Sequence, residues 1–440
     1  MAPGPVDNLV GPMRTLQGQG AASLTEQRSK RAREAFESLP DRYRGADASF
    51  DATFQIRLGD VGRTWEVRTR GDRCEVHLSP AREPDVVIRT DSATWLALRE
   101  GRMSGLDAFS QRRLSAEGNL DLALAFEGLF RLPGNREPLL RIEEVETGAG
   151  RLSTLIAEGG PEQVICLHGL GSSKASFFET VAALAPTHTV HALDLPGFGS
   201  SSKPARAPYN APWMAGAVRG YMDALAIDRA HLVGNSMGGR VALEVGLAAP
   251  ERVGSLSLLA PALAFLRRSR AFLPIVRLLR PELAAIPHPL LKAQVKASFW
   301  ALFAQPDRLD PAAADLAVNE FCRTYRSRAA RVAFHTAARN IYLDEPHGER
   351  GFWTRLKELE PPSLFVWGER DKLIPAGFAR HVTSAIPNAE QIVLEDCGHV
   401  PQVELPERTN ALIRKRIESA SAPRSKRRRP AAPLARGAAG

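Results

Sequence analysis

The chain has 440 residues, of which 24% are charged and 44% hydrophobic, and its formal net charge is +9. This length is enough for two or three domains with at least one large core, and the ordinary charged fraction excludes wholesale disorder. The sequence contains no uninterrupted apolar run of about 18 residues, which is what a membrane-spanning helix needs. We therefore expect a cytoplasmic protein.

The basic charge is concentrated in residues 421–440, which hold six Arg or Lys side chains and no acidic one. Without this segment the net charge falls to +3, so we expect no specific nucleic-acid partner for the body of the protein. A tail rich in Ala, Pro and Arg cannot bury a core and is expected to be disordered. Two interpretations stay open: a solvated tail without a partner, or a tail that binds an anionic membrane surface or another polyanion and makes the protein peripheral at the membrane.

The four cysteines, Cys74, Cys166, Cys322 and Cys397, are widely spaced. None forms a C-x-x-C pair or clusters with histidines at the spacing of zinc ligands. The pattern therefore indicates neither a structural metal nor a disulfide framework, and we expect no cofactor.

Gly and Pro are frequent in residues 1–25, which we interpret as a flexible leader. Residues 26–135 then form a small α+β unit. Apolar and polar residues alternate at 50–58, 65–67, 74–78 and 86–88, with Gly-Asp turns between them, which predicts antiparallel strands joined by hairpins. Asp91-Ser92 provides an N-cap for a helix, and a second helix is expected at about 120–130.

Residues 140–420 have a different sequence pattern, in which short apolar runs alternate with helical stretches. The runs lie at 164–167, 188–193, 231–233, 256–259, 364–367 and 392–394. This alternation predicts a mostly parallel sheet with helices on both faces. Residues of about 262–355 interrupt it with helix-like, Arg- and Pro-rich sequence, which we interpret as a cap above the strand ends, with Phe265 and Phe272 facing the substrate.

The segment Gly234-Asn235-Ser236-Met237-Gly238 is a G-x-S-x-G motif at the point where a buried strand meets a predicted helix. Glycines at both ends allow a sharp turn that exposes the serine side chain. Ser236 is therefore the candidate nucleophile.

A serine hydroxyl needs a neighbouring base to take its proton. Downstream, in the order serine–acid–histidine, Asp371 and His399 each follow an apolar run and are expected at the same sheet edge as Ser236. We assign His399 as general base and then acid, and Asp371 as the group that orients the imidazole; Glu369 is the nearest competitor of Asp371.

Acyl transfer also needs donors for the developing oxyanion. The glycine turn His168-Gly169-Leu170-Gly171 ends the first recognisable strand of this part of the chain. We assign the backbone amides of Leu170 and Met237 as the oxyanion hole, and we expect His168 to hold loops together.

Residues of about 145–418 resemble the α/β-hydrolase family. The matching segments are HGLG at 168–171, DLPGFGSS at 194–201, GNSMGG at 234–239, GERDKLIP at 368–375 and CGHVPQVELPE at 397–407. The resemblance implies an α/β-hydrolase fold, and serine at the elbow disfavours family members that use aspartate there.

Residues of about 30–130 resemble the sterol carrier protein type 2 family, through the strand-rich stretch at 50–90 and the segments TDSATWLALREGRMSGLDAF and RLSAEGNLDLALAF. This resemblance implies a lipid-binding domain with an apolar tunnel for fatty acyl or sterol-like ligands.

Together these features predict a serine hydrolase that cleaves a hydrophobic or lipid acyl ester through an acyl-enzyme intermediate. Two alternatives stay open. One is a hydrolase that cleaves carbon–carbon bonds in ring-cleavage products, since GNSMGG occurs in such enzymes, and the other is a non-catalytic lipid carrier.

Overall fold

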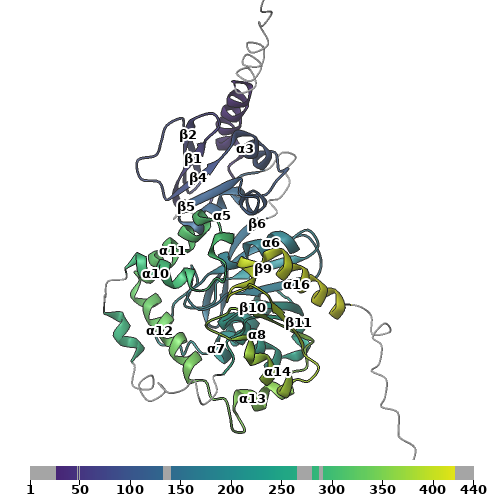
Figure 1. Ribbon diagram of the computed structural model, residues 1–440. Coiled ribbons are helices and arrows are strands. Elements are labelled where there is room, and N and C mark those ends of the chain that lie inside the picture. The colour runs from purple at the N-terminus through teal and green to yellow at the C-terminus, as the bar shows by residue number, and fades with distance from the viewer. Residues whose placement is uncertain are drawn as a thin grey trace, which may run out of the picture.

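The computed structural model describes residues 26–131, except 47 and 49, together with residues 140–264, 280–286 and 291–421. The expected leader, nearly all of the basic tail, and Phe265 and Phe272 of the expected cap lie outside these ranges. In Figure 1 a smaller N-terminal part stands against one end of a larger part that contains the rest of the chain.

The N-terminal part is a five-stranded sheet in the order β3-β2-β1-β4-β5. Its strands are β1 (Asp51–Leu58), β2 (Arg63–Arg70), β3 (Arg73–His77), β4 (Val86–Thr90) and β5 (Leu114–Gly118). The expectation of antiparallel strands throughout 50–90 is wrong for β4, which runs parallel to β1 with Phe54 opposite Val86. Alternation specifies which face of a strand is buried but not its partner. The stretch from residue 59 to 85 between β1 and β4, which includes β2 and β3, is long enough to permit the parallel pairing.

Short helices cover this sheet. They are a helix over residues 26–37, α2 (Leu39–Arg42), α3 (Ser92–Arg99), α4 (Gly105–Ser110) and α5 (Leu120–Gly128). The Asp91 side chain accepts the amide of Thr94 and caps α3, and Asn119 caps α5 in the same way. The core is aromatic: the ring of Phe36 stacks on those of Trp65 and Trp95, each 4.2 Å away between centroids.

The larger part contains an eight-stranded sheet in the order β13-β12-β11-β10-β8-β9-β7-β6. Its strands are β6 (Leu140–Thr147), β7 (Gly150–Ala157), β8 (Gln163–Leu167), β9 (Thr189–Leu193), β10 (Ala230–Asn235), β11 (Val253–Leu259), β12 (Ser363–Gly368) and β13 (Glu390–Leu394). The six strands from β8 onward pair in parallel, whereas β6 and β7 form an antiparallel edge that the sequence analysis did not identify. The predicted mostly parallel sheet is confirmed.

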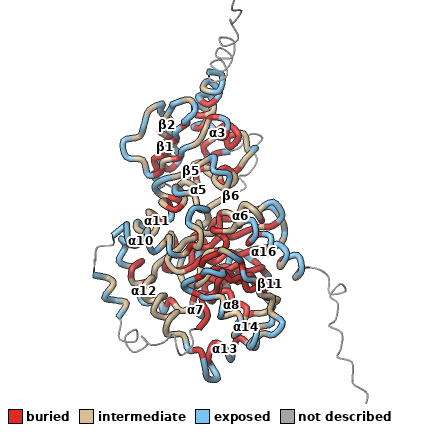
Figure 2. Tube along the Cα trace, in the orientation of Figure 1, coloured by how far each residue is buried: buried red, intermediate tan, exposed pale blue. Residues whose placement is uncertain are grey.

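Helices pack on both faces of this sheet, and Figure 2 shows its buried strands between them. The helices are α6 (Phe178–Leu184), α7 (Ala211–Ala224), α8 (Met237–Ala248), α14 (Ala379–Ala385), α15 (Pro401–Glu404) and α16 (Pro406–Ser421). One core contains apolar residues of α7 and α8, and the other contains those of α6 and α16. Strands that are covered on both faces have no solvent-facing side, and β10 and β11 are accordingly buried along their whole length.

Between β11 and β12 the described residues are helical and lie over the strand ends. These elements are η5 (Pro281–Ala285), α10 (Lys292–Trp300), η6 (Pro306–Arg308), α11 (Pro311–Tyr325), α12 (Arg328–Leu343), α13 (Phe352–Arg355) and η7 (Leu356–Glu358). The N-terminal sheet and the α10–α12 group lie on neighbouring sides of the larger part, with β5 next to α11 (Figure 1).

Candidate active site

Ser236 lies between the end of β10 and the first residue of α8 in a strained backbone conformation, with φ +51° and ψ −114°. Such positive φ values cost a non-glycine residue about 1–3 kcal/mol and persist where the surroundings enforce them. A Cβ atom at Gly238 would lie 2.0 Å from the Leu167 carbonyl oxygen, and one at Gly234 would lie 2.5 Å from the Gly238 oxygen. The two glycines are therefore required for this tight strand-to-helix turn.

Asp371 follows β12 and His399 follows β13, and the structure brings the two side chains together. His399 Nδ1 lies 2.7 Å from Asp371 Oδ2, and both side chains are buried. The other carboxylate oxygen, Oδ1, accepts hydrogen bonds from the amides of Leu373 and Ile374 at 2.8 and 2.9 Å. These bonds fix the carboxylate, and its hydrogen bond to Nδ1 leaves His399 Nε2 as the nitrogen that can accept a proton.

Glu369, the sequence competitor of Asp371, is placed differently. It is exposed, and its carboxylate accepts the amide of Asp396 at 3.2 Å. Glu369 thus contacts the loop after β13, and Asp371 is the acid beside the imidazole.

Asn235, which the sequence analysis did not single out, joins the serine turn to the histidine loop. Its side-chain Nδ2 donates to the carbonyl oxygens of Leu259 and His399, both at 3.0 Å. The sequence feature that could have identified Asn235 is a polar residue at the end of a strand that is expected to be buried. His399 is also held by the cap, because its amide donates to the Leu302 carbonyl at 2.7 Å.

Glu404, on α15, is a second residue that the sequence analysis missed. One of its carboxylate oxygens accepts the amide of Gly398 and the other that of Gln305, each at 2.7 Å. This buried carboxylate therefore connects the histidine loop to the segment after α10.

The two proposed oxyanion donors flank Ser236. Met237 is the first residue of α8, where helical amides have no intrahelical partner, and Leu170 belongs to the glycine turn after β8. Leu170 lines the cavity described below, whereas the Met237 side chain is buried. Within the described part of the chain, neither amide donates a hydrogen bond to another backbone group.

His168 is fully buried and tied to backbone through both ring nitrogens. Nδ1 donates to the Gly169 carbonyl at 2.7 Å, and Nε2 accepts the Leu195 amide at 3.0 Å, a tautomer assigned from these partners. Burial lowers the pKa of this imidazole. A neutral histidine with both nitrogens occupied holds the two loops and has no free site for proton transfer.

A buried ion network supports the loop that contains Leu170. Lys174 Nζ lies 2.6 Å from both Asp194 Oδ2 and Asp121 Oδ1, and its backbone amide donates to Asp194 Oδ1 at 2.7 Å. Burial alone would raise the pKa of Asp194, but the Lys174 charge and hydrogen bonds outweigh it and lower the pKa. Because Asp121 belongs to α5, this network joins the N-terminal part to the candidate site.

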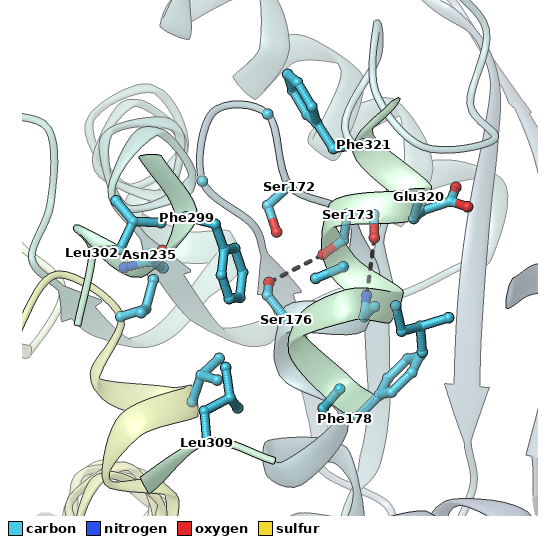
Figure 3. Close-up of a pocket in the computed structure, with 18 of the residues that line it drawn as sticks. Ser172, Ser173, Ser176, Phe178, Asn235, Phe299, Leu302, Leu309, Glu320 and Phe321 are labelled. Carbon is cyan, nitrogen blue, oxygen red and sulfur yellow. Dashed lines mark hydrogen bonds between the residues drawn. The ribbon is translucent and has the colours of Figure 1, made fainter. Parts of the chain in front are cut away.

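A cavity of about 1410 Å³ lies above the strand ends. Ser236 and His399 both line it, so the structure brings all three predicted triad residues to one place. Much of its wall is apolar and comes from the cap and from α6, as the side chains labelled in Figure 3 show: Phe178, Phe299, Leu302, Leu309 and Phe321. Polar side chains such as Ser172, Ser173 and Glu320 lie among these apolar ones, so the cavity is a large site whose wall is apolar over much of its area.

Across the described ranges, no cluster of three or more His, Cys, Asp or Glu side chains is arranged to bind a metal ion. Nor does any helix within those ranges combine the length and apolarity needed to cross a membrane.

Comparisons with known proteins agree with both parts of the fold. A family model described as the alpha/beta hydrolase fold matches residues 163–406, which is more than half of the chain. A model of the SCP-2 sterol transfer family matches residues 34–131. The resemblances to both families are thus confirmed.

Two curated relatives illustrate the range of this family. A dihydrolipoyllysine-residue acetyltransferase component of the acetoin cleaving system from Cupriavidus necator is 30% identical over 272 residues, which cover 59% of this chain and 64% of that protein, less than two thirds of its length. A 2-hydroxy-6-oxononadienedioate/2-hydroxy-6-oxononatrienedioate hydrolase from Paraburkholderia phymatum is 31% identical over 62% of this chain and 90% of its own.

Among solved structures, a bacterial membrane phospholipase A described as a virulence factor is similar, with 28% identity and a TM-score of 0.53 over 64% of this chain and 87% of that one. The matched family model, the sheet order and the serine turn lead to one assignment: the chain belongs to the α/β-hydrolase family and has an N-terminal domain of the SCP-2 sterol transfer family.

Proposed function

We propose that this protein is a serine hydrolase that cleaves a carboxylic ester of a hydrophobic acyl group through an acyl-enzyme intermediate. The observation that carries the proposal is the strained Ser236 turn in the same cavity as a histidine whose Nδ1 is 2.7 Å from a buried carboxylate. A serine becomes a useful nucleophile only beside such a base.

In the first half of the reaction, Ser236 Oγ attacks the ester carbonyl carbon and its proton passes to His399 Nε2. Asp371 stabilises the imidazolium through its hydrogen bond to Nδ1. The carbonyl oxygen gains negative charge, which the Leu170 and Met237 amides stabilise as donors in a water-poor site. The carbon–oxygen bond to the alcohol then breaks, and His399 returns the proton to the leaving alkoxide.

In the second half, water enters and gives its proton to His399, and its oxygen attacks the acyl carbon. The bond to Ser236 Oγ breaks, the proton returns to the serine, and the carboxylic acid leaves. All of the groups required belong to the chain itself.

The walls of the cavity favour a hydrophobic substrate. Its volume of about 1410 Å³ exceeds the roughly 300–1,000 Å³ usual for small-ligand sites, and aromatic and aliphatic side chains form much of its lining. The similarity to a phospholipase A, a protein named for action on phospholipids, supports the same class.

Carbon–carbon hydrolysis of a dienoic ring-cleavage product is the second candidate. It is supported by the similarity to a protein named as a hydrolase of 2-hydroxy-6-oxo dienedioates. Both reactions use a serine site, so the two candidates are distinguished by which class of substrate the enzyme hydrolyses.

Labelling with a short alkyl fluorophosphonate tests the activated serine. We expect the wild-type protein to be labelled and Ser236→Ala not to be, while Ser172→Ala, a matched serine change in the same cavity wall, is labelled at the wild-type rate. Absence of labelling in folded wild-type protein would contradict the proposal. A larger kcat/KM for a 2-hydroxy-6-oxo dienoate than for any acyl ester would favour the second candidate.

A further inference from the structure

The cavity that contains Ser236 is not confined to the hydrolase domain. Phe109 of α4, Leu114 and Ala116 of β5, and Leu120 of α5 line it as well, and all four belong to the N-terminal domain. One wall of the catalytic cavity is therefore supplied by a domain of another family.

This wall is packed firmly against the hydrolase domain. The rings of Phe109 and Phe178 meet edge to face with their centroids 5.9 Å apart. Leu106 and Leu120 belong to the same buried apolar cluster as Val181 of α6. Beside this contact the fully buried Lys174 binds Asp121 of α5 at 2.6 Å. The contact thus combines a continuous core with a buried ion pair, which fixes the position of the wall.

The interior of the N-terminal domain, by contrast, has little room for a lipid. The Phe36, Trp65 and Trp95 rings stack through its core, and the recorded cavity beside them has a volume of only about 60 Å³. An apolar cavity of about 150 Å³ takes up one benzene molecule, so this space is too small for a fatty acyl chain. It adjoins the catalytic cavity, since Phe109, Leu114, Ala116, Leu120 and Phe178 line both.

We infer that the N-terminal domain acts as the far wall of the acyl site and sets the acyl chain length that the hydrolase accepts. This inference rests on the proposed ester hydrolysis. A chain that extends from Ser236 toward the N-terminal domain meets Phe109, Leu114 and Ala116, which line both the catalytic cavity and the small one. The lipid is thus held between the domains, with its carbonyl at the serine.

The inference predicts opposite effects for filling and opening the wall. Leu114→Trp should shift the preferred p-nitrophenyl ester toward shorter chains and lower kcat/KM for the palmitoyl ester roughly tenfold or more, since one methylene alone is worth about tenfold. Phe109→Ala should join the two cavities and shift the preference toward longer chains. Neither residue belongs to the triad or the oxyanion hole.

Two control variants make the same changes away from the cavity. Leu78 is 46% exposed beyond β3, and Phe50 is half-buried against the aromatic core, and neither is among the residues that line the catalytic cavity. Leu78→Trp and Phe50→Ala should therefore keep the wild-type chain-length profile.

Two further measurements separate the failure of this inference from the failure of the proposed function. A short fluorophosphonate should label all four variants at the wild-type rate. If the wild-type protein is not labelled, the proposed ester hydrolysis is contradicted, but the inference about the wall is not. Displacement of a fluorescent fatty acid by acids of graded length tests the wall without catalysis. If both Leu114→Trp and Phe109→Ala keep the wild-type chain-length profile in turnover and in binding, the inference is overturned. If Leu114→Trp does not fold, the chain-length profile of Phe109→Ala decides.

Discussion

Ser236, His399 and Asp371 come from three chain segments, and each is positioned by its own local interactions. The serine is held by its strained turn, the acid by the Leu373 and Ile374 amides, and the histidine by bonds to Asp371 and Leu302. Since each position is fixed before substrate binds, removal of one side chain should affect the reaction far more than the fold.

Replacement of Ser236 or His399 by alanine should lower kcat for an acyl ester by about 10⁶-fold, because members of a triad act as a unit. Asp371→Asn should cost about 10⁴-fold, since it leaves the imidazole in the wrong tautomer. Steady-state kinetics check the losses and circular dichroism checks the fold. Near-wild-type turnover by Ser236→Ala would show that another residue is the nucleophile.

Two buried histidines outside the site should make stability depend on pH. Burial lowers the pKa of both His191 and His231 to about 4. Below about pH 6.5 the unfolded chain therefore binds protons that the folded chain does not, and stability is lost as the pH falls toward 4. Urea unfolding should show a free energy of unfolding that is lower at pH 4.5 than at pH 7, with each histidine contributing on the order of 2 kcal/mol.

His191→Gln is the matched variant, because His191 shares hydrogen bonds with Tyr221 and Gln163 that an amide can partly replace. Its loss of stability between pH 7 and pH 4.5 should be smaller than that of the wild type. An unchanged pH slope in this variant would contradict the assignment.

At the scale of elements, the 3-10 helix η2 (Lys174–Phe177) follows the loop that contains Leu170, the proposed oxyanion donor, and its first residue is Lys174. Lys174 is fully buried between Asp194 and Asp121, so its removal leaves Asp194 as an uncompensated buried charge. Lys174→Met should lower the free energy of unfolding by about 3–5 kcal/mol. Urea denaturation measures this free energy. For the control Lys372→Met, at an exposed lysine, the free energy of unfolding should stay within about 0.5 kcal/mol of the wild-type value.

Asp121→Asn should be milder, about 1 kcal/mol, because its side chain is partly exposed and Asp194 still balances Lys174. Equal losses in Asp121→Asn and Lys174→Met would show that the Lys174–Asp121 pair between the domains contributes more to stability than the Lys174–Asp194 pair.

The elements differ in how far the sequence predicts them. Short, mostly apolar runs such as 231–233 and 256–259 identify the central parallel strands, and the G-x-S-x-G turn and the segments that contain Asp371 and His399 follow from them. The sequence analysis missed β6 because it is an edge strand, whose charged residues, among them Glu143 and Glu144, hide the alternation. Its antiparallel partner β7 was missed with it. The amide contact of Asn235 with His399 spans 164 residues, and local pattern contains no information on such a pair.

At the scale of the whole molecule, the N-terminal and hydrolase domains share one apolar cluster. Leu106 and Leu120 pack with Phe177, Val181 and other hydrolase residues. Shared burial of this kind makes separate unfolding unfavourable, because either domain alone would expose apolar surface to water. No sequence pattern within one domain predicts it, since the partners are distant in the chain.

The two domains should therefore unfold together. Native-state hydrogen exchange should give the same free energy of opening for the most protected amides of β1 and β10, within about 1 kcal/mol. Phe178→Ala combined with Asp121→Asn, which removes contacts on both sides of the interface, should separate the two values. Different values already in wild-type protein would show that the domains open independently.

The cysteines give the cap a property useful for spectroscopy. Burial raises the pKa of Cys74 to about 11 and that of Cys397 to about 12, and it raises the pKa of Cys166 as well. Since the thiolate is the reactive species, we expect these three thiols to be alkylated slowly at neutral pH. Cys322 remains as the attachment point for a dye, half-buried on α11 next to Phe321 of the cavity wall. A maleimide fluorophore on the natural sequence would thus sit on the helix that faces β5 and report, turnover by turnover, when an acyl chain fills the space between the domains.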